Sequence, residues 1–268
     1  MTSPFDSVTF PRGPAMANRL MLAPLTNQQS NADGTMSDDE FHWLTMRAQG
    51  GFGLTMTCAS HVQAVGQGFA GQMGIWSDDH VDGLTRLAAA LNATGTVSYA
   101  QLHHAGNRAP AAVIGAQPVC PSDDESTGAR ALTHDEVQQV VADFVAAAVR
   151  AQRAGFHGVE LHGAHGYLIC QFLSADLNRR TDEYGGSLEN RSRLLFEIID
   201  GIRAVCGDDL ALAVRLSPER FGMRVAEIVE VHGRLVTSGK VDMIDMSLWD
   251  YERVVDEPGF EGRRLTDI

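Results

Sequence analysis

Residues 159–168 read VELHGAHGYL, a short apolar run followed by two histidines and a tyrosine. Glycines on both sides of the histidines exclude a simple helix, so the polar groups are expected where a strand opens into a loop. At the carboxyl ends of parallel strands, side chains face the crevice in which α/β proteins bind ligands. Two imidazoles can hold a carbonyl or anionic oxygen there, and a phenol can donate a proton. His162, His165 and Tyr167 are therefore the candidate catalytic residues.

Short apolar runs alternate with amphipathic helical patterns along the rest of the chain, as expected for parallel strands that are buried on both faces. The clearest helix covers residues 133–154, where a capping box begins at Thr133 and Gly155 stands at the expected end. The strands that we expect are residues 19–25, 53–58, 96–102, 158–162, 210–216 and 241–247. This alternation predicts a repeating β/α fold.

Two connections after strands are much longer than the usual ~2–6 residues. Residues 103–132 follow the third strand and residues 163–188 follow the fourth. Long loops on this side of a parallel sheet commonly build or cover an active site. Before the first strand, residues 8–10 and 15–17 flank a Pro-Arg-Gly-Pro turn and are expected to form a small hairpin.

Composition narrows the range of partners and compartments. With 21 basic and 34 acidic residues, the net charge is −13, which argues against nucleic acid or an anionic membrane as a partner. The chain contains no 18-residue apolar run, and its first residues do not resemble a signal peptide. The four cysteines fit no metal-site spacing and are interpreted as reduced thiols, with a disulfide left open. We expect a soluble cytoplasmic protein.

Polar residues at other strand ends suggest what the site binds. A strand that ends in an arginine, as at Arg215, is costly unless an acceptor-rich group meets the guanidinium. Gln101 offers both a donor and an acceptor, Thr26 offers a hydroxyl, and the small Ala59 leaves room for a flat ring. A planar heterocycle with alternating acceptors and donors would satisfy these groups together.

These segments resemble the Old Yellow Enzyme family of FMN-dependent NADH:flavin oxidoreductases. The similarity runs in order from about Phe5 to Asp250, and its most specific part is residues 159–191. The matching segments are NRLMLAPLT at 18–26, GIWSD at 74–78, QLHHAG at 101–106, AGF at 154–156, HGAHGY at 162–167, QFLS at 171–174, RRTDEYGGSLENR at 179–191 and RLS at 215–217.

The resemblance implies a (β/α)8 TIM barrel with FMN at its carboxyl face and NADH or NADPH as the reductant. It implies that His162 and His165 bind the carbonyl oxygen of an α,β-unsaturated substrate and that Tyr167 is the proton donor. The reaction implied is ping-pong: NAD(P)H reduces the flavin, and hydride then reaches the alkene β-carbon while the α-carbon is protonated. The positions implied to contact the isoalloxazine ring are Pro24, Leu25, Thr26, Ala59, Gln101 and Arg215.

Other interpretations accompany this one. Two histidines three residues apart can form a structural or metal-binding pair. We place Glu160 on the opposite strand face from His162, which leaves no third ligand at hand, and we predict no metal site. We expect Arg179, Arg180, Asp182 and Glu183 to form a structural salt-bridged turn. Alternative functions are an amine dehydrogenase or dienoyl reductase of the same fold, and a non-catalytic barrel fragment that cannot retain FMN.

The end of the chain departs from the family pattern. We count six strands where the family's barrel needs eight, and residues 249–268 are polar and offer no further strand or helix pair. The expectation is a single FMN-binding domain over residues 1–268 that lacks the last two βα units, including the family's phosphate-gripping loop. Further sequence or another chain would supply them. The alkene, the choice between NADH and NADPH, and a homo-oligomeric state remain open.

Overall fold

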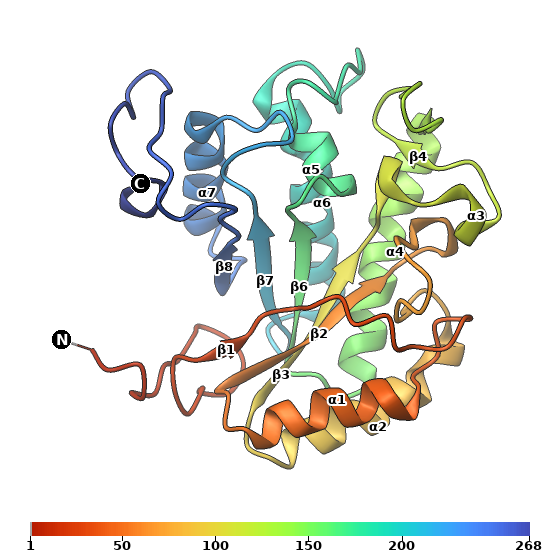
Figure 1. Ribbon diagram of the computed structural model, residues 1–268, viewed down its shortest axis with the longest axis vertical. Coiled ribbons are helices and arrows are strands. Elements are labelled where there is room, and N and C mark those ends of the chain that lie inside the picture. Colours follow the sequence, from red (N-terminus) through yellow and green to blue (C-terminus); the bar gives the residue numbers. More distant parts are fainter. Residues whose placement is uncertain (1) are drawn as a thin grey trace.

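The computed structural model describes residues 2–268 and is organised around one parallel sheet of six strands (Figure 1). The strands are hydrogen-bonded in the order β1-β2-β3-β6-β7-β8, and every neighbouring pair is parallel. Their bounds are Met21–Leu22 (β1), Leu54–His61 (β2), Val97–His103 (β3), Gly158–Gly163 (β6), Ala211–Leu216 (β7) and Met243–Met246 (β8). All six predicted strands are present. The first is much shorter than expected, because Pro24 has no N–H to continue the ladder.

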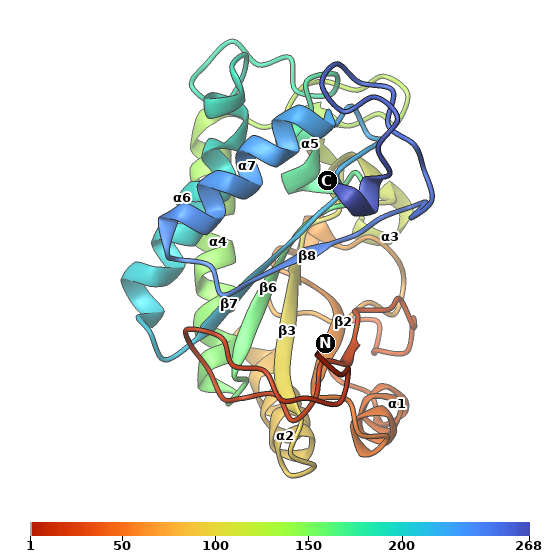
Figure 2. The ribbon, with the colours of Figure 1, turned by 90° about the vertical axis from the view of Figure 1, so that its left-hand side faces the viewer.

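Helices lie between successive strands and pack on the outer face of the sheet (Figure 2). The predicted capping box is confirmed: the Thr133 hydroxyl accepts from the Glu136 N–H at 3.2 Å, and the Glu136 carboxylate accepts from the Thr133 N–H at 2.8 Å. The helices are α1 (Asp38–Gln49), α2 (Val81–Asn92), α3 (Ala111–Ile114), α4 (His134–Arg153), α5 (Leu168–Leu173), α6 (Leu188–Cys206) and α7 (Val225–Ser238).

The sheet curls into part of a barrel and has two different faces. Alternate strand residues such as Leu161 and Val214 point outward into the main apolar core beneath the helices. The others point inward, where Tyr99 and Ala213 form the lower part of the barrel interior. The predicted hairpin is present as a single bridge between Val8 and Met16, and it covers this lower end. The fold is therefore a partial (β/α)8 barrel whose β1 and β8 edges are unpaired within residues 2–268.

A bulge in β2 determines which of its residues face the interior. Met56 pairs with Tyr99, but Ala59 pairs with Gln101, so β2 uses one residue more than β3 over this step. Because side chains alternate along a strand, the extra residue exchanges the two faces. Cys58 consequently joins the outer core, and Ala59 faces inward beside Gln101.

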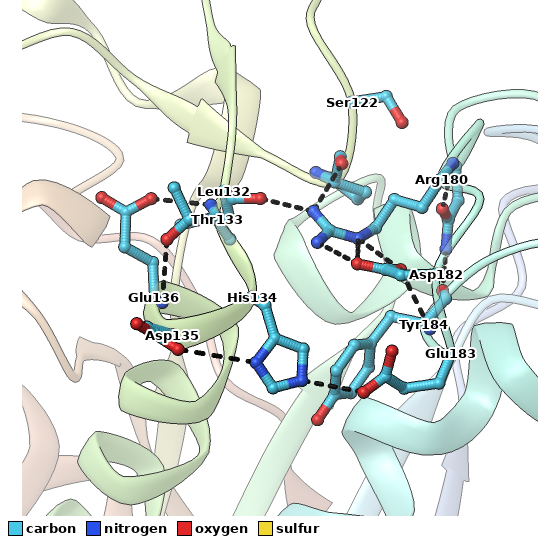
Figure 3. A network of polar contacts seen from close by, with 12 residues as sticks. Ser122, Leu132, Thr133, His134, Asp135, Glu136, Arg180, Asp182, Glu183 and Tyr184 are labelled. Atoms are coloured by element: carbon cyan, nitrogen blue, oxygen red, sulfur yellow. Dashed lines mark hydrogen bonds and ion pairs between the residues drawn. The ribbon is translucent and has the colours of Figure 1, made fainter.

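The two long loops meet above the carboxyl ends of the strands and are joined by a polar network (Figure 3). Arg180 pairs with Asp182 at 2.5 Å and also donates to the carbonyl of Leu132 in the other loop. Glu183 bonds to His134 at 2.8 Å. The predicted salt-bridged turn is thus confirmed for Arg180 and Asp182. Arg179 instead donates to backbone carbonyls, and Glu183 pairs with the start of α4.

The last twenty residues form turns that pack against α7. Within this segment, Val254 and Arg264 make one bridge, and Leu265–Asp267 is a single 3-10 turn. Val255 and Leu265 bury against Val225. The segment therefore adds no paired strand or α-helix, as the sequence predicted. Across residues 2–268, none of the helices has both the length and the apolarity needed to cross a bilayer.

Candidate active site

One cavity of about 270 Å³ opens at the carboxyl ends of the strands and collects all the candidate site residues. Phe69, from the loop after β2, is the one lining residue that the sequence did not single out. The predicted residues that line the cavity are Pro24, Leu25, Thr26, Ala59, Gln101, His162, His165, Tyr167 and Arg215. Residues from four strands, from the segment after β1 and from two loops are thus brought together, although they lie far apart along the chain.

Residues 162–167, the central block of the site, supply three polar side chains from a strand end and the turn that follows. His162 ends the inward-facing row of β6, and Tyr167 is the N-cap of α5. Between them, His165 has φ of 60°, a left-handed conformation that is uncommon outside glycine, and Gly166 has φ of 72°. A Cβ added to Gly166 would lie 2.7 Å from the Phe221 ring. The tight turn therefore needs a glycine at Gly166 and imposes strain at His165.

Hydrogen bonds fix the arrangement of the two histidines. The Ala164 N–H donates to His162 Nδ1 at 3.3 Å, which places the His162 proton on Nε2. His162 Nε2 lies 3.3 Å from His165 Nδ1, and His165 Nε2 lies 2.6 Å from the Ser247 hydroxyl. The Ser217 hydroxyl accepts from the His165 N–H at 3.0 Å. In this arrangement the His162 N–H faces His165 and the His165 Nε2 faces Ser247, and both rings line the cavity.

Both imidazoles are neutral at pH 7. Burial, reinforced by His103, His165 and Arg215, holds the pKa of His162 well below its usual value. Burial and the positive charge of Arg215 lower the pKa of His165 to about 4. The histidines can therefore donate hydrogen bonds to an oxygen without carrying a charge. Within residues 2–268, no group of three or more His, Cys, Asp or Glu side chains is placed to hold a metal ion.

Tyr167 is held by aromatic contacts and an arginine. Its ring makes edge contacts with His103 at 4.4 Å and with His162 at 5.0 Å between centroids. The Arg108 guanidinium lies 4.9 Å from the Tyr167 ring centroid and donates to the His165 carbonyl. Tyr167 lines the cavity together with both histidines, where its hydroxyl can meet a substrate.

Gln101 and Arg215 line the lower part of the cavity, and the side chain of each contacts an acidic residue. Gln101 Nε2 donates to Glu160 at 2.6 Å, and Arg215 Nε lies 3.1 Å from an Asp245 carboxylate oxygen. Our placement of Glu160 was wrong. Residues two apart on a strand share a face, so Glu160 points into the barrel interior directly beneath His162.

The opposite wall of the cavity is more open. Leu25 is 51% exposed, and Thr26 is also exposed, whereas Gln101 is fully buried. The small Ala59 side chain, turned inward by the bulge, lies next to Gln101. An acceptor-rich planar ring could therefore lie between the Thr26 side and the Gln101–Arg215 side, with its polar edge on the buried groups.

Several cavity and supporting residues were missed by sequence reasoning. Glu160 and Asp245 could have been found from the period of two, because each occupies an inward position on its strand. Phe69 lies in a glycine-flanked loop and carries no local signal that places it in the site. His103, at the end of β3, is buried against Tyr167, with Nδ1 3.0 Å from Gln72 Nε2.

Comparison with known proteins was made on sequence and on structure. Residues 8–259 match the family model described as "NADH:flavin oxidoreductase / NADH oxidase family". The chain is 37% identical over 256 residues to "Probable NADH-dependent flavin oxidoreductase YqiG" of Bacillus subtilis, covering 92% of this chain and 68% of that protein. It is 39% identical over 241 residues to an NADPH dehydrogenase of Bacillus pumilus, covering 88% and 70%.

A solved structure shares the arrangement of the whole chain. The Old Yellow Enzyme homologue from Zymomonas mobilis superposes with a TM-score of 0.86 at 30% identity, over 98% of this chain and 76% of that one. In some longer relatives the matched part is a smaller share. An NADH oxidase of Thermoanaerobacter brockii is 38% identical over 81% of this chain, which spans only 36% of that protein.

Proposed function

Since this chain belongs to the Old Yellow Enzyme family of NADH:flavin oxidoreductases, whose cofactor is FMN, we propose that it is an ene-reductase. The proposed reaction uses NADH or NADPH to reduce the C=C bond of α,β-unsaturated carbonyl compounds. The observation that carries the proposal is the single cavity in which His162, His165 and Tyr167 face Gln101 and Arg215. Two neutral N–H donors, a phenol and a cation are the groups that this chemistry requires.

The residues on the buried side fit the polar edge of a flavin ring. The amide oxygen of Gln101 has no partner within residues 2–268, so it can accept from a ring N–H. Within the same residues, Arg215 donates one hydrogen bond, from Nη2 to Ser247 at 3.3 Å. Its guanidinium can therefore stabilise the negative charge that the ring gains on reduction. Pro24, Leu25 and Thr26 would border the ring on the open side.

We assign substrate binding and proton transfer to the central block. When bound, FMN accepts hydride from NAD(P)H and supplies it to the β-carbon of the alkene. His162 and His165 would donate hydrogen bonds to the carbonyl oxygen, which draws electron density from the β-carbon. Tyr167 would then protonate the α-carbon, because it lines the same cavity as the two histidines and its ring lies 5.0 Å from that of His162.

Colour and two half-reactions test the proposal. The purified protein loaded with FMN should be yellow, and anaerobic NADH or NADPH should bleach it. Cyclohexenone should then restore the visible absorbance. A flavin-loaded protein that NAD(P)H bleaches but that no activated alkene reoxidises would contradict the ene-reductase assignment.

Product analysis separates the alternatives. An amine dehydrogenase would reduce its flavin with an amine, and a dienoyl reductase would prefer a conjugated dienoyl substrate. Only an ene-reductase converts a simple enone into the saturated ketone. A colourless protein that cannot be loaded with FMN would favour the non-catalytic barrel fragment.

Replacing both histidines should separate binding from proton transfer. In His162→Ala with His165→Ala, we expect weaker binding of phenols and enones by roughly ten- to a hundred-fold, because two neutral hydrogen bonds of about 1 kcal/mol each are lost. The measurement is spectral titration of the bound flavin with p-hydroxybenzaldehyde. His232→Ala, in a histidine on α7 outside the cavity, is the matched control. Unchanged phenol affinity in the double variant would rule out the proposed role.

We propose that residues 1–268 belong to a single FMN-binding barrel domain that two further βα units complete. The support is physical: β8 is an unpaired edge, and an apolar hollow of about 380 Å³ lies beside it between α7 and the final turns. Unpaired edges and apolar hollows of this kind are normally covered. The hollow is lined by Val225, Ile228, Val229, Met246, Leu248 and Leu265, among others. The units could come from further sequence or from another chain.

We also propose a cytoplasmic location. All four cysteines are buried and free, which is typical of a reducing compartment.

A further inference from the structure

Two acids and one arginine share the barrel interior directly beneath the cavity. Glu160 on β6 is fully buried, and its Oε2 accepts from Gln101 Nε2 at 2.6 Å. Its other oxygen, Oε1, is buried and makes no hydrogen bond within residues 2–268. On the neighbouring strands, Arg215 and Asp245 are paired in register and lie 3.1 Å apart. Glu160 thus has an amide partner but no cation of its own.

The charges of its neighbours decide whether the Glu160 carboxyl group is ionised or protonated. The single positive charge of Arg215 is already matched by Asp245, which is its strand neighbour. If Glu160 were also ionised, the cluster would hold one uncompensated negative charge on a fully buried side chain. A buried unpaired carboxylate is far more costly than a buried carboxylic acid. The neutral form of Glu160 removes that cost and leaves the cluster without net charge.

We propose that Glu160 holds a proton at neutral pH and acts as the positioning residue for the Gln101 amide, so that Arg215 and Asp245 carry the only charges of this three-residue cluster. With its Nε2 held by Glu160, Gln101 presents its carbonyl oxygen to the cavity. The inference rests on the proposed function in taking Gln101 as a flavin-facing residue. The protonation of Glu160 itself stands on the apoprotein alone.

The groups that face Glu160 act on its pKa in both directions, and burial has the largest effect. Burial comes first and, with Asp245, raises the pKa of Glu160 to about 8, while Gln101 and Arg215 oppose the rise. Tyr99, two residues before Gln101 on β3, is itself neutral, because burial raises its pKa. His162, above it on β6, is also neutral. Arg215 is therefore the only cation that opposes the proton on Glu160.

The sign of the pH effect follows from linkage. An acid whose pKa is higher in the folded state than its usual 4.5 costs no stability below pH 4.5. Between pH 4.5 and about 8, the unfolded chain releases the proton and the folded chain retains it, so stability falls as the pH rises. Glu160→Gln mimics the protonated acid and removes this penalty. Its folded-to-unfolded ratio should gain on the wild type by about tenfold per pH unit across that window.

Chemical denaturation of both proteins without flavin, from pH 5 to pH 9, measures this gain. Infrared spectroscopy of the wild type gives a second readout that needs no variant. A carboxylic-acid carbonyl band should be present at pH 7, should disappear as the pH passes about 8, and should be absent from Glu160→Gln. A Glu160→Gln stability difference that does not change with pH, or a wild type without the band, would overturn the inference.

Asp245→Asn tests the charge balance of the cluster. It removes the acid that matches Arg215, so Glu160 should lose its proton to pair with the arginine, and the infrared band should be absent at pH 7. A band that persists at pH 7 in Asp245→Asn would contradict the charge balance, and a band that survives in Glu160→Gln would show that the proton belongs to Asp245; either result overturns the proposal.

The positioning role is tested in the FMN-loaded protein by fluorescence titration of flavin binding. Glu160→Gln should bind FMN within about threefold of the wild type, whereas Glu160→Ala should bind roughly tenfold more weakly, because Gln101 loses its partner. Equal affinity in all three proteins would remove the positioning role. If the wild type binds FMN but reduces no enone, the proposed function fails while the Glu160 inference stands.

Discussion

Replacing Tyr167 with phenylalanine is expected to slow alkene reduction by roughly ten- to ten-thousand-fold and to leave flavin reduction by NAD(P)H almost unchanged. The ring is retained, so its packing against His103 and His162 should persist. Only the hydroxyl is removed, and with it the proton for the substrate α-carbon. Hydride transfer from NAD(P)H to the flavin needs no proton from this group.

Anaerobic stopped-flow measurement of the two half-reactions separates these effects. The matched control is Tyr251→Phe, which removes the same hydroxyl from a residue that is 67% exposed and outside the cavity. The control should match the wild type in both half-reactions. Equal losses in the two half-reactions of Tyr167→Phe would indicate a general disturbance of the site instead of a lost proton donor.

Completing the barrel is expected to tighten FMN binding by roughly a hundred- to ten-thousand-fold. In the proposed closed barrel, the added units bring at least two hydrogen bonds to the FMN phosphate, each contributing about 1.5–3 kcal/mol when the acceptor is charged. They also pair the β8 edge and fill the apolar hollow beside α7. The isolated chain should therefore melt less cooperatively and hold the flavin weakly.

The experiment compares the isolated chain with one that carries a C-terminal completion of ~70–100 residues, the length of two βα units in a typical barrel. FMN affinity is measured by fluorescence titration and cooperativity by calorimetry. An unrelated helical extension of equal length is the control, and it should restore neither property. A monomeric isolated chain that melts cooperatively and binds FMN as tightly as the completed one would refute the need for closure.

The six strands were predictable from the sequence, because buried parallel strands appear as short apolar runs that alternate with helical patterns. The ends of the strands and their irregularities were less predictable. β1 covers only Met21–Leu22, since the proline at position 24 interrupts its ladder. The bulge in β2 left no trace in the hydrophobic pattern, because the residues on both sides of it are buried. Ala59 reaches the cavity only through that bulge.

The candidate residues were also brought together as the sequence analysis expected, although their roles remain predictions. They could be found because strand ends of one sheet meet on the same side, wherever they lie in the chain. Glu160 was misplaced by neglecting the period of two. Asp245 was passed over because its role depends on Arg215, its partner on the neighbouring strand. The local sequence does not show which residues pair between strands.

Anaerobic single turnover with cyclohexenone is a direct test of the proposed ene-reductase activity. The FMN-loaded protein is reduced with one equivalent of NADPH, freed of the nicotinamide and mixed with the enone, and the product is quantified by gas chromatography. We expect one cyclohexanone to form for each flavin reoxidised, with recovery of the visible absorbance. A flavin that stays bleached in the presence of the enone but is reoxidised by oxygen, with no cyclohexanone formed, would contradict it.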